Sequence, residues 1–105
     1  MMPAVDVTVR EEGEGWTAEV IVRDQTVTTH RVRISRAEYK RFGGGDVREL
    51  VRRSFEFLLA RESNTSILRD FSLATIESYF PEYAVEMGHR RARLPHAPGS
   101  SPTDV

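Results

Sequence analysis

Residues 46–62, DVRELVRRSFEFLLARE, form the longest stretch of this 105-residue chain in which apolar side chains recur with an unbroken helical period. At about 100° per residue, these side chains gather on one face roughly 200° wide, opposite the charged ones. A face this broad is typical of a helix buried against a sheet, so we expect this helix to lie across one. Asp46 can cap its first turn, and Glu49 stands where a capping box places an acid. The apolar face comprises Val47, Leu50, Val51, Ser54, Phe55, Phe57, Leu58 and Leu59.

Three segments before this helix alternate apolar and polar side chains, as half-buried strands do. They are residues 4–10, 16–23 and 27–34. The connections between them are short, namely the glycine-containing EEGEG at 11–15 and DQT at 24–26. Because connections this short join neighbouring antiparallel strands, the sequence predicts a three-stranded antiparallel meander.

A short helix is predicted between the third strand and the long helix. SRAE at 35–38 is a capping box, in which a serine and a glutamate satisfy each other's free amides. The helix should run over residues 36–42 and end at the three glycines that follow, because glycine continues a helix poorly.

A third helix is predicted after the long one. Ser72 can cap it, apolar side chains then recur at helical spacing, and Pro81 interrupts it, with residues 82–87 able to add one or two turns. We therefore expect an α+β domain over residues 1–88, in which a three-stranded antiparallel meander is followed by three helices and the longest helix packs on the sheet. The predicted core comprises Val5, Val7, Val9, Val20, Val22, Val32, Ile34, Leu50, Val51, Phe55, Leu58, Ile67, Leu68, Leu73, Ile76 and Phe80.

Composition limits the chemistry that is open to the chain. It has no cysteine, which excludes disulfides, thiolate catalysis and cysteine-based metal sites. No apolar run approaches the ~18 residues of a membrane span, and the N-terminus lacks the basic and apolar regions of a signal peptide. We therefore expect a cytoplasmic protein. The strong preference for arginine, with Lys40 as the only lysine, is a weak indication of a bacterial source.

Charge is distributed unevenly along the chain. Residues 1–88 hold 12 basic and 15 acidic side chains, a net charge of −3, whereas residues 89–105 carry a net charge of +2. This last segment, HRRARLPHAPGSSPTDV, contains three prolines and few apolar side chains. We expect it to be a disordered basic tail.

Residue patterns typical of catalysis are missing from the sequence. It contains no nucleophile elbow, no HExxH motif and no paired-histidine spacing. His30 shares a strand face with apolar side chains, and we interpret it as a core-edge histidine with a satisfied ring nitrogen. The acidic residues of 11–14 are interpreted as a solvated turn. We expect a protein that is not an enzyme and that has no cofactor and no metal site.

The polar face of the predicted third strand carries Thr29, Arg31 and Arg33. With the two helices after it, this segment resembles ribbon-helix-helix repressors and, in outline, HicB-type antitoxins. The resemblance covers residues 29–62 and implies that the strand enters the major groove of DNA with those three side chains contacting bases. Two departures favour a solvated strand face with ion pairs to Glu19 instead. The first helix with its loop is several residues shorter than in that family, and two further strands precede the ribbon.

A second run of aromatic and apolar residues extends over 55–83. Its residues are Phe55, Phe57, Leu58, Leu59, Arg61, Glu62, Ser66, Ile67, Leu68, Phe71, Leu73, Ile76, Tyr79, Phe80, Pro81, Glu82 and Tyr83. In this run the chain resembles short bacterial proteins of unassigned function that share F-x-F-L-L-x-R-E-x-x-x-S-I-L-x-x-F-x-L-x-x-I-x-x-Y-F-P-E-Y. The resemblance supports the predicted fold and implies no activity.

The sequence identifies no specific biochemical activity, and three classes of function stay open. The leading interpretation is a non-catalytic protein–protein interaction or regulatory module, because so small a core cannot bury every ring of YFPEY at 79–83. Its candidate partner-binding residues are Tyr79, Phe80 and Tyr83, and its partner is an unidentified protein or a second copy of the chain. The alternative is a nucleic-acid-binding protein of the ribbon-helix-helix or antitoxin kind. The third class is an enzyme of unidentified type, and no membrane partner is expected.

Overall fold

The structure is a computed structural model that describes residues 3–42 and 45–92. It shows an α+β fold in which a sheet is covered by helices, as the sequence predicts. In chain order, the elements are β1 (Ala4–Glu12), β2 (Gly15–Arg23), β3 (Val27–Ile34), α1 (Arg36–Phe42), α2 (Val47–Leu59), the 3₁₀ turn η1 (Asn64–Ser66), β4 (Asp70–Ser72), α3 (Leu73–Tyr79) and α4 (Tyr83–Ala92).

The first three strands form the antiparallel meander that the sequence predicts. Val7, Val20 and His30 lie side by side across β1, β2 and β3, so alternate residues of each strand point to the same face. Gly13 lies in the turn between β1 and β2 with a φ of 62°, a backbone conformation that glycine adopts without strain. This alternation gives the sheet one apolar and one polar face.

A fourth strand, β4, extends the sheet beyond the meander. It pairs parallel with β3, which gives the strand order β1-β2-β3-β4. The Arg31 amide donates to the Arg69 carbonyl at 2.7 Å, and Phe71 points from β4 into the core. The sheet is therefore four-stranded and mixed rather than the predicted three-stranded antiparallel meander, because a short strand forms just before α3.

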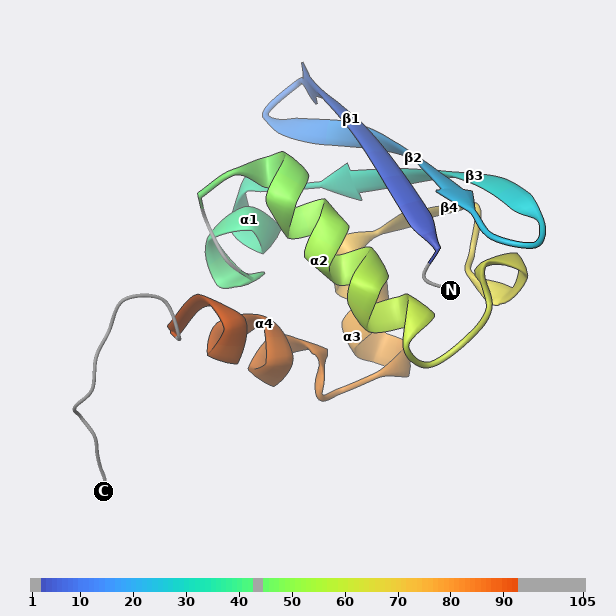
Figure 1. The fold of residues 1–105 in the computed structure, drawn as a ribbon. Coiled ribbons are helices and arrows are strands. Elements are labelled where there is room, and N and C mark those ends of the chain that lie inside the picture. The colour runs from blue at the N-terminus through green and yellow to red at the C-terminus, as the bar shows by residue number, and fades with distance from the viewer. Residues whose placement is uncertain (1–2, 43–44, 93–105) are drawn as a thin grey trace.

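The helices lie on one face of the sheet and leave the other face open (Figure 1). α2 runs beside β1 and carries arginines whose side chains reach that strand. Arg48 Nε donates to the Val7 carbonyl at 3.3 Å, and Arg52 Nη1 donates to the Val5 carbonyl at 3.0 Å. The long helix thus packs on the sheet as predicted, and its first half also covers the outer edge of β1.

The core lies between the sheet and the helices, and most of its predicted members are buried. The prediction is wrong for Leu68, which is 46% exposed, while Val5, Val9 and Phe80 are half-buried. The confirmed members are Val7, Val20, Val22, Val32, Ile34, Leu50, Val51, Phe55, Leu58, Ile67, Leu73 and Ile76. Buried hydrophobic residues that the prediction omitted are Ala18, Phe42, Phe57, Phe71, Tyr83 and Met87.

Three helices begin where local sequence predicts, although Ser72 makes no side-chain capping hydrogen bond at the start of α3. The Ser35 amide donates to Glu38 Oε1 at 2.8 Å, and the Glu38 amide donates to Ser35 Oγ at 3.1 Å, which is a reciprocal capping box. Asp46 Oδ1 accepts a hydrogen bond from the Arg48 amide at 2.9 Å and caps α2. α2 then ends at Leu59, before the predicted residue 62.

The chain after Pro81 forms a fourth helix, where the sequence predicts one or two turns over residues 82–87. α4 continues to Ala92, so the predicted domain boundary at residue 88 falls inside a helix. Residues 93–105 of the predicted tail lie outside the described residues.

Candidate functional site

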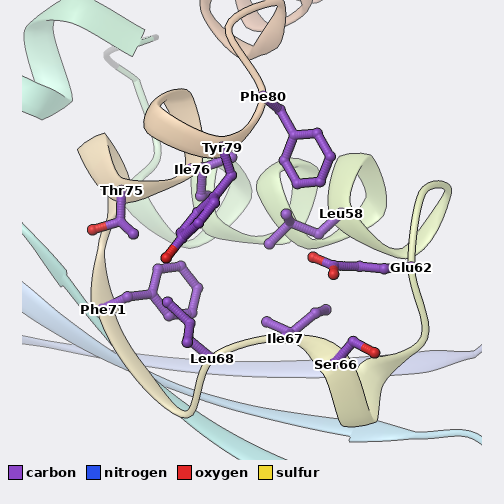
Figure 2. A pocket seen from close by; sticks show the side chains of 10 residues that line it. All are labelled: Leu58, Glu62, Ser66, Ile67, Leu68, Phe71, Thr75, Ile76, Tyr79 and Phe80. Carbon is purple, nitrogen blue, oxygen red and sulfur yellow. The ribbon is translucent and has the colours of Figure 1, made fainter.

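A hollow of about 270 Å³ opens between the end of α2, the segment from η1 to β4, and α3 (Figure 2). Most of its wall is apolar, and one carboxylate, that of Glu62, lies among the lining side chains. The lining residues are Leu58, Glu62, Ser66, Ile67, Leu68, Phe71, Thr75, Ile76, Tyr79 and Phe80.

Regular secondary structure holds the walls of the hollow. Leu58 of α2, Phe71 of β4 and Ile76 of α3 are each buried against the core. The start of α3 is fixed from another helix, because Glu38 Oε2 of α1 accepts a hydrogen bond from the Ala74 amide at 2.8 Å. These walls are therefore set by the packing of the whole domain.

A buried chain of hydrogen bonds fixes the backbone beneath Leu68. His30 is 1% exposed, its Nδ1 lies 2.7 Å from the Leu68 carbonyl, and its Nε2 lies 2.8 Å from Thr28 Oγ1. A carbonyl only accepts, so Nδ1 carries the proton and Nε2 accepts from the threonine hydroxyl. Asn64 Nδ2 completes the chain by donating to Thr28 Oγ1 at 3.0 Å and to the Thr26 carbonyl at 2.7 Å. The interpretation of His30 as a histidine with a satisfied ring nitrogen is confirmed, although the side chain is fully buried and does not lie at the edge of the core.

The surroundings of His30 favour its neutral form. Burial lowers the pKa of His30 below its ordinary value of 6.5, the hydrogen bond to the Leu68 carbonyl opposes this shift, and the charge of Arg69 adds to it. No carboxylate among the described residues contacts the ring, and His30 does not line the hollow.

Two of the three predicted partner-binding residues lie at the hollow. Tyr79 is 66% exposed, and Phe80 is half-buried with its edge against the ring of Phe57, 5.9 Å between centroids. Figure 2 shows both rings extending from the end of α3 toward the hollow. With Leu68 they form an exposed apolar rim.

The third predicted residue, Tyr83, belongs to the core, and its prediction as a contact residue is wrong. Its side chain is fully buried, with ring centroids 4.9 Å from Phe42 and 5.3 Å from Phe57. Ser54 Oγ donates to the Leu50 carbonyl at 2.8 Å, so the Tyr83 hydroxyl donates to Ser54 Oγ at 2.6 Å. The small Ser54 leaves room on α2 for the ring, and burial raises the pKa of Tyr83.

The predicted base-contacting residues lie on the open face of the sheet, away from the hollow. Thr29, Arg31 and Arg33 are all exposed, but Arg33 Nη1 forms an ion pair with Asp70 Oδ1 at 2.6 Å. The resemblance to ribbon-helix-helix repressors requires a strand that is free to pair across a dimer. β3 instead pairs with β2 on one side and, at residues 31–33, with β4 on the other. Arg31 is opposite Glu19 in the register, as the alternative interpretation requires, but the ion pair that is formed on this face joins Arg33 to Asp70.

Two further findings concern the described part of the chain only. No group of three or more His, Asp or Glu side chains there is placed to hold a metal ion. No helix within residues 3–42 and 45–92 is long and apolar enough to cross a membrane.

Sequence reasoning missed most of the hollow because it assigned several lining residues to the core. Leu58, Ile67 and Ile76 are indeed buried, yet each also exposes part of its side chain to the hollow. The aromatic and apolar run over 55–83 is the sequence signal that could have identified the hollow. Nine of the ten lining residues belong to this run, and Thr75 is the exception.

Comparisons with protein-family models, with curated proteins and with solved structures give no match to this chain.

Proposed function

We propose that this protein is a non-catalytic protein–protein interaction module that receives an apolar side chain of its partner in the hollow. The observation that carries this proposal is the rim, where Tyr79 and Leu68 are 66% and 46% exposed beside a largely apolar cavity. Large apolar side chains clustered around a concavity are typical of contact sites, and tyrosine is among the residues that contribute most binding energy there.

The hollow is of a size that suits a side chain of a partner. Its volume of about 270 Å³ lies below the roughly 300–1,000 Å³ of pockets that enclose drug-sized ligands. One or two apolar side chains of a partner fill such a space, while the backbone of the partner stays on the rim. Burial of these groups against Leu58, Phe71 and Ile76 would provide the driving force.

The chemistry of the lining supports binding over catalysis. General acid–base catalysis needs a group positioned to take a proton and, commonly, a second group to return it. Glu62 is the one carboxylate of the lining, and neither histidine nor lysine is present among the described residues that form it. Ser66 and Thr75 have hydroxyl neighbours, Ser63 Oγ at 3.4 Å and Ser72 Oγ at 3.3 Å, and no base within the described ranges contacts either hydroxyl.

The proposal is tested with N-acetyl-phenylalaninamide, a blocked single residue, followed by amide chemical shifts in ¹⁵N-labelled protein. We expect shifts that are confined to residues lining the hollow and that saturate at millimolar probe. Leu68→Ala and Tyr79→Ala should weaken binding by a few-fold each, because each removes apolar surface from the rim. Val85→Ala is the matched control, since Val85 is 58% exposed on α4 and does not line the hollow.

Two results would contradict the proposal. One is the lack of saturable shifts at the hollow in the wild-type protein. The other is equal weakening by the rim variants and by Val85→Ala, which would show that the probe binds exposed apolar side chains without selecting the hollow.

A further inference from the structure

Glu62 is the feature of the hollow that an apolar ligand leaves unexplained. It follows the last turn of α2 and is only partly exposed. Figure 2 shows its carboxylate directed into the hollow, between Leu58 and Ile67. A carboxylate among apolar side chains retains unsatisfied acceptor oxygens unless water or a bound donor reaches them.

Most carboxylates in the described part of the domain have a hydrogen-bond or ion-pair partner, but Glu62 has none. Asp6 pairs with Arg23, Glu77 with Arg41, and Asp70 and Glu82 are likewise in ion pairs. Among the described residues, no hydrogen bond or ion pair to the side chain of Glu62 is found.

The cation nearest to Glu62 in sequence is used elsewhere. The guanidinium of Arg61 stacks over the ring of Phe57, with its carbon 3.6 Å from the centroid, and Arg61 Nε binds Glu82 Oε2 at 3.2 Å. Arg61 Nη1 also donates to the Phe57 carbonyl at 2.9 Å. Arg61 is thereby held on the side of α2 that faces Phe57 and the segment before α4.

We infer that the partner segment recognised by this hollow carries a basic side chain next to its apolar anchor, and that Glu62 receives the positive charge. This inference rests on the proposed function and adds the chemistry of the partner. The lining holds one negative charge and, among its described residues, no Arg or Lys, so its charge is complementary to a cation. Arginine fits best, because its planar guanidinium packs on aromatic rings such as Tyr79 and Phe80 while it binds a carboxylate.

Three peptides of equal length distinguish recognition of a positive charge from binding of the apolar anchor alone. They are acetyl-Gly-Phe-Arg-amide, acetyl-Gly-Phe-Gln-amide and acetyl-Gly-Phe-Glu-amide. The glutamine peptide keeps neutral N–H donors, so it controls for hydrogen bonding without charge. Dissociation constants come from the same amide-shift titration at low salt. The variants are Glu62→Gln and, as matched control, Glu19→Gln, which removes an exposed carboxylate from the open face of the sheet.

We expect the wild-type protein to bind the arginine peptide about two- to fivefold more tightly than the glutamine peptide, the range that partly exposed ion pairs provide. The glutamate peptide should bind most weakly. The preference for arginine should disappear in Glu62→Gln, persist in Glu19→Gln and shrink with added salt.

The outcomes distinguish failure of the inference from failure of the proposed function. Equal binding of all three peptides at the hollow, or a preference that survives in Glu62→Gln, overturns the inference and leaves the interaction module intact. If none of the peptides shifts the amides of the hollow, both the inference and the proposed function are overturned.

Discussion

Tyr83 attaches the first turn of α4 to the rest of the domain, and Met87 of the same helix is buried beside the core as well. The ring of Tyr83 fills the space between Phe42 and Phe57, and its hydroxyl donates to Ser54 on α2. A ring that contributes both packing and a buried hydrogen bond allows the two contributions to be measured separately.

Two substitutions of Tyr83 should lower the free energy of unfolding by different amounts. Tyr83→Phe removes one buried hydrogen bond and should lower the free energy of unfolding by about 1 kcal/mol, since Ser54 still donates to the Leu50 carbonyl. Tyr83→Ala also creates a cavity and should cost about 3–5 kcal/mol. Urea unfolding measures both, with Tyr79→Ala as the control that should cost under about 1 kcal/mol because Tyr79 is exposed. Equal losses for the two alanine variants would place Tyr83 outside the core.

His30 should make the stability of the domain depend on pH. Its pKa is lowered in the folded protein, so between the two pKa values the unfolded chain binds the proton and the native state does not. The stabilisation from neutral His30 is complete above its unfolded pKa near 6.5 and is lost as pH falls toward the folded pKa. The free energy of unfolding should fall by up to about 1.4 kcal/mol per pH unit in this window. In His30→Gln the slope should be flatter, and an unchanged slope would assign the pH dependence to other groups.

At the scale of elements, α2 protects an edge of the sheet. β1 is an edge strand, and its outer carbonyls would otherwise be free to pair with another chain. Arg48 and Arg52, one helical turn apart, donate to two of these carbonyls, those of Val7 and Val5. The arginines thus occupy the positions that a neighbouring strand would use.

Removing both arginines should therefore promote association through β1. We expect Arg48→Ala/Arg52→Ala to form dimers or larger species whose population rises with concentration, measured by size-exclusion chromatography with light scattering. Arg31→Ala/Lys40→Ala is the control, since it removes the same charge from exposed positions elsewhere and should stay at the wild-type mass. Association of the control to the same extent would attribute the effect to net charge alone.

The elements that local sequence predicts are those whose signals lie within a few residues of each other. Local signals of this kind predict the three strands within residues 4–34, the capping box of Ser35 and the cap at Asp46, and the structure contains all of them. β4 was missed because three residues carry no strand pattern of their own, and pairing with β3 decides their conformation. Glu38 illustrates the same difference. Its capping box with Ser35 is predictable from neighbouring residues, whereas its hydrogen bond to the Ala74 amide of α3 depends on the tertiary fold.

The candidate site was predicted less completely than the fold, because exposure depends on the whole packing. Local pattern cannot separate Tyr79 from Tyr83, which lie four residues apart with 66% and 0% of their surfaces exposed. Leu68 looked like a core residue, yet its carbonyl is bound by His30 and its side chain lines the hollow. The aromatic segment was correctly identified as too large to bury entirely, and the structure determines which ring stays outside.

At the scale of the whole molecule, the two faces of the domain differ in chemistry. The helical side contains the apolar hollow, and the open face of the sheet carries charges of both signs. Across β1, β2 and β3 this face carries mainly short polar, acidic and basic side chains, with Ile21 half-buried and Val27 exposed among them. A protein partner is therefore expected on the helical side.

The open face should not bind duplex DNA in the manner of a ribbon-helix-helix protein. Arg31 and Arg33 are exposed there, but Asp6, Glu19 and Asp70 share the face, and Asp70 already pairs with Arg33. DNA binders present a clear basic surface, and their affinity falls steeply with salt because each neutralised phosphate releases counterions. In a fluorescence anisotropy titration at low salt, we expect no saturable binding of a labelled duplex at micromolar protein. Binding that weakens steeply with salt and is abolished by Arg31→Ala/Arg33→Ala, with the hollow variant Tyr79→Ala unaffected, would contradict this prediction. It would move the functional surface from the hollow to the open face of the sheet, which lies on the other side of the strands.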